Sequence, residues 1–486
     1  MDILKTTAKG IAWTTVSSIV RSIVSLVQVS ILTRFLAKGD FGIVAIANLF
    51  IGFTGIFLDM GLSVGIMHRN DTTPQQYSSL FWLNIFAGIT LTTILCFVSP
   101  LAAHFYHEPE LTKVLMLLSL SVFFSSLGSQ HRTVQQKRMR FKYIALIEIT
   151  TLLLSMALAI VFAVSGAGLY SIVYSSLFHS LSASLLFLII GLVKDHNISF
   201  HFKLSETYDY LKIGVYSMGS QILDFFSRES DILIISATLG TEIVGVYSLC
   251  KRLVLSIYNT VNPIINRVIT PVIAELQEQK QRVRNLYLTL TETLSLVYMP
   301  VYCLLAVFAF GILNFIYGPD YVDGTVVLQF VALSYGITAS CSLIGSLQTA
   351  YGRTDLGFYW TICRIVLTVL AVYVGSLFGL NAIAFALLAL NIVNNPLFFR
   401  ITIYPIIGYG YSEYYRKTIF VGFVVIAFSL PFYLFCNHMT NVIICLGIGV
   451  VYSVLYALLV LWLFPKSYLV RLAKEKIGSL RDIDYF

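Results

Sequence analysis

Five basic residues lie deep inside long apolar stretches of the sequence: Arg21, Arg228, Lys251, Arg252 and Arg364. A charge at the centre of a membrane helix costs roughly 2.5 to 3.5 kcal/mol, so such residues are rarely placed there without a role. Guanidinium groups bind phosphate oxygens bidentately, and the hydrogen bonds are charge-assisted. We therefore expect these five cations to line a water-filled cavity that attracts an anion, with pyrophosphate as the best ligand.

Acidic residues accompany the cations on one predicted helix. Asp224, Arg228 and Asp231 follow i, i+4, i+7 spacing and share a helix face, which predicts an internal ion network, while Glu229 is turned about 100° away. Lys251 and Arg252 lie at a depth at which their positive charges can compensate those of Glu229 and Asp231.

A second candidate pair involves the first two predicted helices. Arg21 and Asp59 lie at similar depths from the same side, so we expect that they can pair. The carboxylates form a candidate ion network or coupling site. The alternative for all of these charges is a structural one, in which buried ion pairs hold helices together, and the two roles are compatible.

The composition requires that most of the chain be surrounded by lipid. Of its 486 residues, 57% are hydrophobic and 12% are charged, and the mean hydropathy is +0.83. A water-soluble globule cannot hide that much apolar surface. Runs of about twenty apolar residues, each long enough to cross a bilayer, predict an all-α polytopic membrane protein with about fourteen helices. They lie near residues 11–36, 42–67, 79–104, 112–134, 144–164, 168–193, 212–238, 243–270, 286–316, 326–351, 357–378, 380–404, 415–436 and 441–464. Closed β-barrels are excluded, because these runs do not alternate apolar and polar residues.

The distribution of basic residues predicts the orientation. With both termini in the cytoplasm, 22 of the 32 Lys and Arg residues lie in inward-facing loops and termini and three lie in outward-facing loops. This asymmetry follows the positive-inside rule, which explains the net charge of +8 better than a nucleic-acid partner does. The stretch 131–143 and the tail from Lys466 can also touch anionic membrane lipids.

Two pairs of similar segments in the sequence indicate an internal repeat. LAKGDFG at 36–42 matches the frame of LGTEIVG at 239–245, and VLMLLSLS at 114–121 matches VLQFVALS at 327–334. They predict two pseudo-equivalent six-helix bundles around a central cavity, at 1–200 and 201–405, followed by two additional helices at 406–465 and a cytoplasmic tail at 466–486. Lobes of this kind expose a central site to either side in turn.

Other chemistry is not indicated. The seven cysteines form no CxxC pair, and the histidines show no spacing suited to a metal. No catalytic residues, metal site or cofactor are predicted, and the chain is not expected to be an enzyme. Helix breakers such as Gly61, Gly65, Pro263, Pro271 and Pro300 are candidate hinges, although glycine and proline are ordinary in membrane helices.

Four segments carry a resemblance to a known family. They are KGIAWTTVSSIVRSIVSLVQVSILTRFLAKGDFGIVAIA near the N-terminus, LDMGLS at 58–63, QQKRMRFKYIALIE at 135–148 and SRESDILIISATLGTEIVGVYSL at 227–249. They resemble bacterial polysaccharide flippases of the Wzx and colanic acid exporter group, within the multidrug, oligosaccharidyl-lipid and polysaccharide exporter superfamily. Many relatives carry Asn in the last block, where this chain has Glu229 and Ser230.

The resemblance implies a flippase that moves undecaprenyl-diphosphate-linked oligosaccharide repeat units to the periplasmic leaflet of the inner membrane, for capsule, O-antigen or exopolysaccharide. It also implies a cationic lumen, coupling to an H⁺ or Na⁺ gradient, and other polysaccharide assembly proteins as candidate partners. Three alternatives remain: a drug or lipid II exporter of the same superfamily, a membrane enzyme acting on lipid-linked sugar, and a scaffold protein. The absence of a large outer loop argues against the enzyme.

Overall fold

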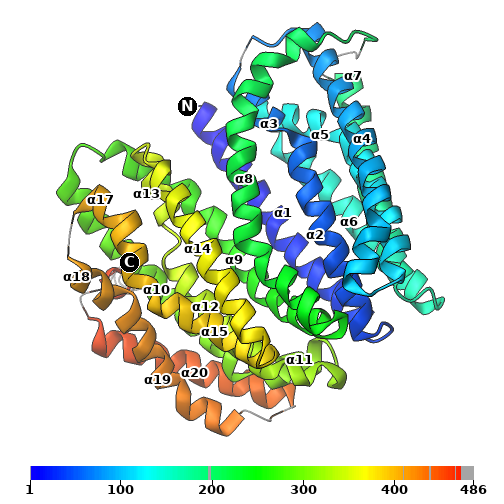
Figure 1. Ribbon diagram of the computed structural model, residues 1–486. Coiled ribbons are helices and arrows are strands. Elements are labelled where there is room, and N and C mark those ends of the chain that lie inside the picture. Colours follow the sequence, from blue (N-terminus) through cyan, green and yellow to red (C-terminus); the bar gives the residue numbers. More distant parts are fainter. Residues whose placement is uncertain are drawn as a thin grey trace, which may run out of the picture. The chain divides into compact units, whose positions relative to one another are not determined.

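The chain is helical throughout the part that the computed structural model describes (Figure 1). The described residues are 2–69, 71–194, 199–408, 410–436, 439, 441–465 and 467–471, and they contain no strand. This confirms the predicted all-α class. Most of the predicted tail at 466–486 lies outside the described residues.

The chain divides into two compact units, Met1–Leu249 and Cys250–Phe486. Helix α8 (Leu204–Leu239) packs on α2, α3 and α4 of the first unit, and the predicted lobe boundary near residue 200 stays a prediction. The other helices that begin in that unit are α1 (Asp2–Leu32), α2 (Lys38–Asp59), α3 (Leu62–His68), α4 (Pro74–Tyr106), α5 (Glu110–Lys137), α6 (Phe141–Val164), α7 (Tyr170–Lys194) and α9 (Thr241–Glu275).

The second unit is built around α10 (Lys280–Val307), which packs on α12 (Thr325–Ser340) and α19 (Ile419–Cys436). Its remaining elements are α11 (Ala309–Ile316), η1 (Pro319–Gly324), α13 (Ile344–Ala350), α14 (Thr354–Ser376), α15 (Leu380–Val393), α16 (Asn395–Phe398), η2 (Phe399–Ile403), α17 (Tyr404–Ile407), α18 (Tyr411–Lys417) and α20 (Val442–Leu463).

The described residues contain eleven helices that are long and apolar enough to cross a membrane, or twelve if the bent pair Leu380–Val393 and Asn395–Ile407 is one span. The other two predicted spans, 212–238 and 243–270, coincide with α8 and α9. Both are long helices, but neither is among the eleven, and it is these two helices that carry most of the predicted site charges. The predicted count of about fourteen is therefore close.

Helix α5 occupies the middle of the first unit, where it contacts α2, α3, α4, α6 and α7. Its polar residues are therefore inside the bundle, and Ser119, Ser126, Thr133 and Gln135 are all buried. Helix α4 begins with a capping box, in which the backbone N–H of Gln76 donates to the Thr73 hydroxyl and the Gln76 side chain accepts from the backbone N–H of Thr73. These two helices provide much of the first unit's interior.

The predicted span at 42–67 is interrupted. Helix α2 ends at Asp59, Met60 and Gly61 adopt left-handed backbone conformations, and α3 begins at Leu62. A Cβ atom on Gly61 would lie 2.3 Å from Cα of Gly214 on α8, so only glycine allows this crossing. By contrast, the candidate hinges Pro263, Pro271 and Pro300 all lie within continuous helices.

Candidate functional site

Arg21 belongs to an ion cluster that joins three helices of the first unit. Its Nη1 lies 3.4 Å from Oε2 of Glu148 on α6, and Arg132 on α5 lies 2.8 Å from Oε1 of the same carboxylate. The Ser17 hydroxyl donates to Glu148 as well, at 3.4 Å. One carboxylate thus holds two guanidinium groups, and the cluster keeps a net positive charge.

The predicted pairing of Arg21 with Asp59 is therefore wrong. Asp59 accepts a hydrogen bond from the Ser63 hydroxyl, which lies 3.1 Å from the hydroxyl of Thr133 on α5. The predicted pair rests on depth alone, and depth says nothing about the direction in which each helix turns its side chain. Helix α1 packs on α6, and this brings Arg21 to Glu148.

On α8, Arg228 forms an ion pair with Asp224 one turn earlier, as the i, i+4 spacing predicts. Both side chains are more than half exposed. Asp231 has a different environment, because it is 8% exposed and accepts a hydrogen bond from the Tyr247 hydroxyl at 2.6 Å. Glu229 is partly buried, and its compensation by basic residues of α9 stays a prediction.

The other three predicted cations lie in the second unit. Lys251 is 3% exposed, Arg252 is exposed, and Arg364 on α14 is partly buried. Among the described residues, Arg364 has no ion-pair or hydrogen-bond partner. An unpaired guanidinium inside an apolar helix needs water or an anionic ligand.

The exposed fractions of the arginine side chains indicate whether they contact lipid or water. Arg21 and Arg132 have side chains that are 47% and 46% exposed, and Arg228 is 62% exposed. Long arginine side chains near a helix end can reach the headgroups, but Arg21 and Arg228 are too far along their helices to do so. Because a charge facing hydrocarbon is costly, a guanidinium group at such a position within a membrane requires contact with water or an anion. This requirement is what an aqueous cavity lined by cations would satisfy.

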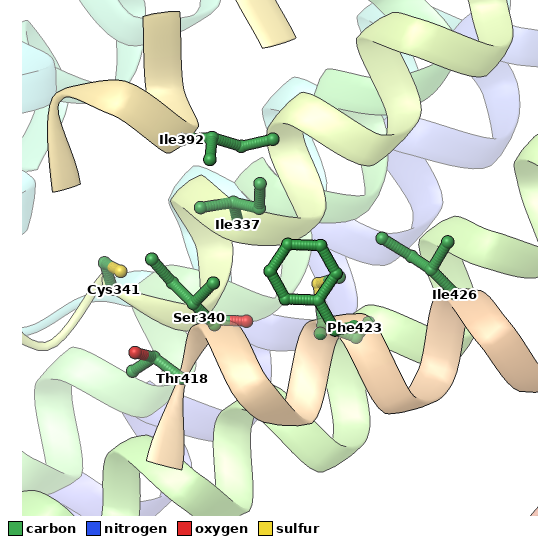
Figure 2. A pocket seen from close by; sticks show the side chains of 10 residues that line it. Ile337, Ser340, Cys341, Ile392, Thr418, Phe423 and Ile426 are labelled. Atoms are coloured by element: carbon green, nitrogen blue, oxygen red, sulfur yellow. The ribbon is translucent and has the colours of Figure 1, made fainter. Parts of the chain in front are cut away.

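A second kind of site lies in the second unit, where an apolar pocket of about 370 Å³, open space included, is lined by residues of α10, α12, α15 and α19 (Figure 2). Phe423 and Ile426 on α19 face Ile337 on α12. Its few polar lining groups include Ser340 and Thr418. Such a lining suits hydrocarbon and not a charged group.

Sequence reasoning missed Glu148 and Arg132. Arg132 belongs to the basic stretch 131–143 at the end of the predicted span 112–134, whereas α5 continues to Lys137 and keeps Arg132 on the helix. Glu148 was visible as a lone acid in the apolar run ALIEITT, and a search for acids as well as cations in every span would have found it.

Comparisons with known proteins identify the family of the chain. A family model described as "Polysaccharide biosynthesis protein" matches residues 31–326, which is more than half of the chain. "Teichuronic acid biosynthesis protein TuaB" of Bacillus subtilis strain 168 is 27% identical over 395 residues, covering 81% of each chain. "Lipopolysaccharide biosynthesis protein WzxC" of Escherichia coli K12 is 24% identical over 452 residues, covering 93% of this chain and 89% of the relative.

Solved structures share the fold at low sequence identity. "Lipid II flippase MurJ, inward closed conformation" has a TM-score of 0.74 at 13% identity and covers 93% of this chain and 99% of its own. An inward-facing multidrug resistance MATE family transporter has a TM-score of 0.65 at 15% identity, covering 79% of this chain and 94% of its own. Together with the helical fold and the charged spans, the match over residues 31–326 confirms the resemblance read from the sequence, and the chain belongs to the polysaccharide biosynthesis protein family.

Proposed function

We propose that this protein is a flippase that moves a lipid-linked oligosaccharide, carried on undecaprenyl diphosphate, from the cytoplasmic to the periplasmic leaflet for surface polysaccharide synthesis. The observation that carries the proposal is the set of exposed cations on long helices, namely Arg21, Arg132 and Arg228, together with Arg364, which has no ion-pair partner among the described residues. The names of the relatives, among them a succinoglycan biosynthesis transport protein of Rhizobium meliloti, support the substrate class.

The proposed mechanism is alternating access. The diphosphate headgroup enters from the cytoplasmic leaflet and exchanges hydration water for guanidinium groups, since bidentate Arg–phosphate contacts compensate part of the desolvation. The lipid tail stays in the bilayer. The lobes then reopen toward the periplasm, where the headgroup is released. Every step is a binding or a conformational change, so we infer that the protein catalyses no covalent reaction.

The residues expected to bind the headgroup are Arg21, Arg228, Lys251, Arg252 and Arg364. Glu148 has a supporting role in this account, because it fixes Arg21 and Arg132 near one another without neutralising both. Asp224 similarly orients Arg228. The pairs are thus positioned so that the approaching diphosphate competes for cations that are already held in place.

The proposed location is the bacterial cytoplasmic membrane with both termini in the cytoplasm, and the distribution of Lys and Arg supports this orientation. Alkaline phosphatase fusions after residues 109 and 318 should be active, because both points lie in predicted outward loops, and fusions after residues 203 and 279 should be inactive. The opposite pattern would reverse the orientation and with it the direction of transport.

A cellular experiment tests the function. Deleting the gene in its native host should stop surface polysaccharide formation and cause lipid-linked repeat units to accumulate on the cytoplasmic side, and the wild-type gene should restore export. Normal polysaccharide in the deletion strain, with altered drug sensitivity or lipid II accumulation instead, would favour the other exporters of this fold.

A further inference from the structure

The interruption between α2 and α3 places a carboxylate at a helix end inside the membrane. Helix α2 stops at Asp59 because Met60 and Gly61 leave the helical conformation, and the contact of Gly61 with Gly214 prevents any larger residue from restoring it. The C-terminal end of a helix carries a partial negative charge. Interrupted membrane helices commonly use such ends to bind cations.

A polar pocket opens beside this break. It measures about 220 Å³, with open space included, and lies between α2 and α3 on one side and α4 and α5 on the other. Three of its nine lining residues are apolar, namely Leu62, Ile66 and Leu80. The other six all carry a side-chain oxygen, and they are Asp59, Ser63, Asn84, Ser129, Gln130 and Thr133.

In each of the two amide side chains of the pocket, the nitrogen donates a hydrogen bond and the oxygen accepts none from the described residues. Nδ2 of Asn84 donates to the Ser129 hydroxyl at 2.5 Å, and Nε2 of Gln130 donates to the Tyr77 carbonyl at 2.8 Å. Oδ1 of Asn84 and Oε1 of Gln130 are buried and have no hydrogen-bond partner among the described residues. The two side chains are only 4% and 6% exposed.

These unused oxygens point to a missing ligand. Leaving a buried acceptor unpaired costs about 1–3 kcal/mol, and most buried polar groups in native proteins are satisfied. Rotating the Gln130 amide does not help, because its oxygen would then face the Tyr77 carbonyl. Such oxygens are satisfied either by a water, which donates hydrogen bonds, or by a cation, which accepts electron pairs from several oxygens at once. The Asp59 carboxylate in the same lining favours the cation.

The single negative charge among the described lining residues favours a monovalent cation over a divalent one. Among the described residues that line the pocket, Asp59 alone is charged. Two nearby cations of α5 are engaged elsewhere, Arg132 with Glu148 and Lys137 with the backbone carbonyls of Ile66 and Arg69. Among the described residues no cluster of three or more His, Cys, Asp or Glu exists, whereas Ca²⁺ sites usually gather several carboxylates.

We propose that this pocket binds Na⁺, with ligands from the Asp59 carboxylate, the amide oxygens of Asn84 and Gln130, and the hydroxyls of Ser63 and Thr133. Oxygen ligands suit such a hard cation. Binding neutralises Asp59 and satisfies both amide oxygens, so it links α2 and α3 to α4 and α5. That this ion drives transport rests on the proposed function, but the binding itself does not.

The test is direct Na⁺ binding to the full-length protein, purified and placed in lipid nanodiscs. ²²Na⁺ binding is measured with choline as the balancing cation. The wild type should bind saturably, and Asp59→Asn, which keeps the size of the side chain, should weaken binding by about 10-fold or more. Asp355→Asn is the matched control, because Asp355 is an exposed carboxylate that pairs with Arg353, and it should bind as the wild type does.

A second variant guards against misfolding. Gln130→Leu removes one ligand oxygen and no charge, and it should also weaken Na⁺ binding. Absence of saturable binding in the wild type, or wild-type affinity in a folded Asp59→Asn or Gln130→Leu protein, would overturn the proposal. If Na⁺ binds as expected and the protein moves no lipid-linked sugar, the site stands and only the proposed transport function fails.

Discussion

Gly42 and Gly245 each pack against the turn that precedes the other. A Cβ atom on Gly42 would lie 1.9 Å from the Thr241 carbonyl oxygen, and a Cβ atom on Gly245 would lie 2.0 Å from the Lys38 carbonyl oxygen. In the frame of the repeat, LAKGDFG over LGTEIVG, Lys38 corresponds to Thr241 and Gly42 to Gly245. The contact is therefore reciprocal, as expected where two equivalent segments meet around a local two-fold axis.

This reciprocal contact predicts that neither glycine tolerates a side chain. Gly42→Val or Gly245→Val should force the two turns apart and destabilise the protein by about 1–3 kcal/mol, as overpacking does. Thermal unfolding of the purified variants measures the loss. Gly55→Ala is the control, because a Cβ atom added to Gly55 on α2 would meet no atom of another described segment within 4 Å. Equal melting temperatures for all of these variants would contradict the contact.

The ion cluster around Glu148 predicts a coupling between Arg21 and that carboxylate. Glu148→Gln leaves two guanidinium groups without their shared partner and should destabilise more than Arg21→Gln does. Because both arginines are nearly half exposed, the coupling energy from a double-mutant cycle should be about 1 kcal/mol. Strictly additive effects in that cycle would mean that Arg21 and Glu148 do not interact in the membrane.

The hydrogen bond from Tyr247 to Asp231 predicts a loss of stability in Tyr247→Phe. The variant removes one hydrogen bond to a buried carboxylate, which should cost about 1–3 kcal/mol. Tyr216→Phe is a suitable control, since Tyr216 is on α8 with a side chain that is 81% exposed. Unfolding of both proteins in the same detergent compares them, and an equal effect of the two changes would contradict the assignment.

The ionisation of Glu206, which lies before the predicted span in α8, should make the stability of the protein depend on pH. Hydrogen bonds from Ser79, at 2.6 Å, and from His201 lower the pKa of Glu206. Because the pKa of Glu206 is lower in the folded state than in the unfolded state, ionised Glu206 stabilises the fold at a pH above the unfolded-state pKa. This stabilisation is lost as the pH falls through the folded-state pKa. Glu206→Gln should thus lower the melting temperature at pH 7 and lose that deficit at strongly acidic pH. A deficit that does not change with pH would contradict the mechanism.

Spacing in the sequence predicts contacts within one helix, but it does not predict which side chains meet between helices. The i, i+4 spacing of Asp224 and Arg228 correctly predicted their ion pair, since both lie on one helix. The partner of Arg21 was missed because Glu148 is brought to it only by the packing of α1 on α6, which no spacing in the sequence encodes. The amide oxygens of Asn84 and Gln130 were missed for the same reason, because their burial depends on three helices meeting.

The central claim is best tested by lipid transport in vesicles containing the purified protein. A lipid-linked oligosaccharide is placed in the membrane, and its exposure to an impermeant sugar-modifying enzyme outside is followed over time. We predict that the wild type makes the inner-leaflet lipid accessible and that the Arg21→Gln, Arg364→Gln double variant, correctly inserted, does so at least about 10-fold more slowly. A folded wild-type protein that leaves the inner pool protected, or a double variant with wild-type rates, would contradict the account.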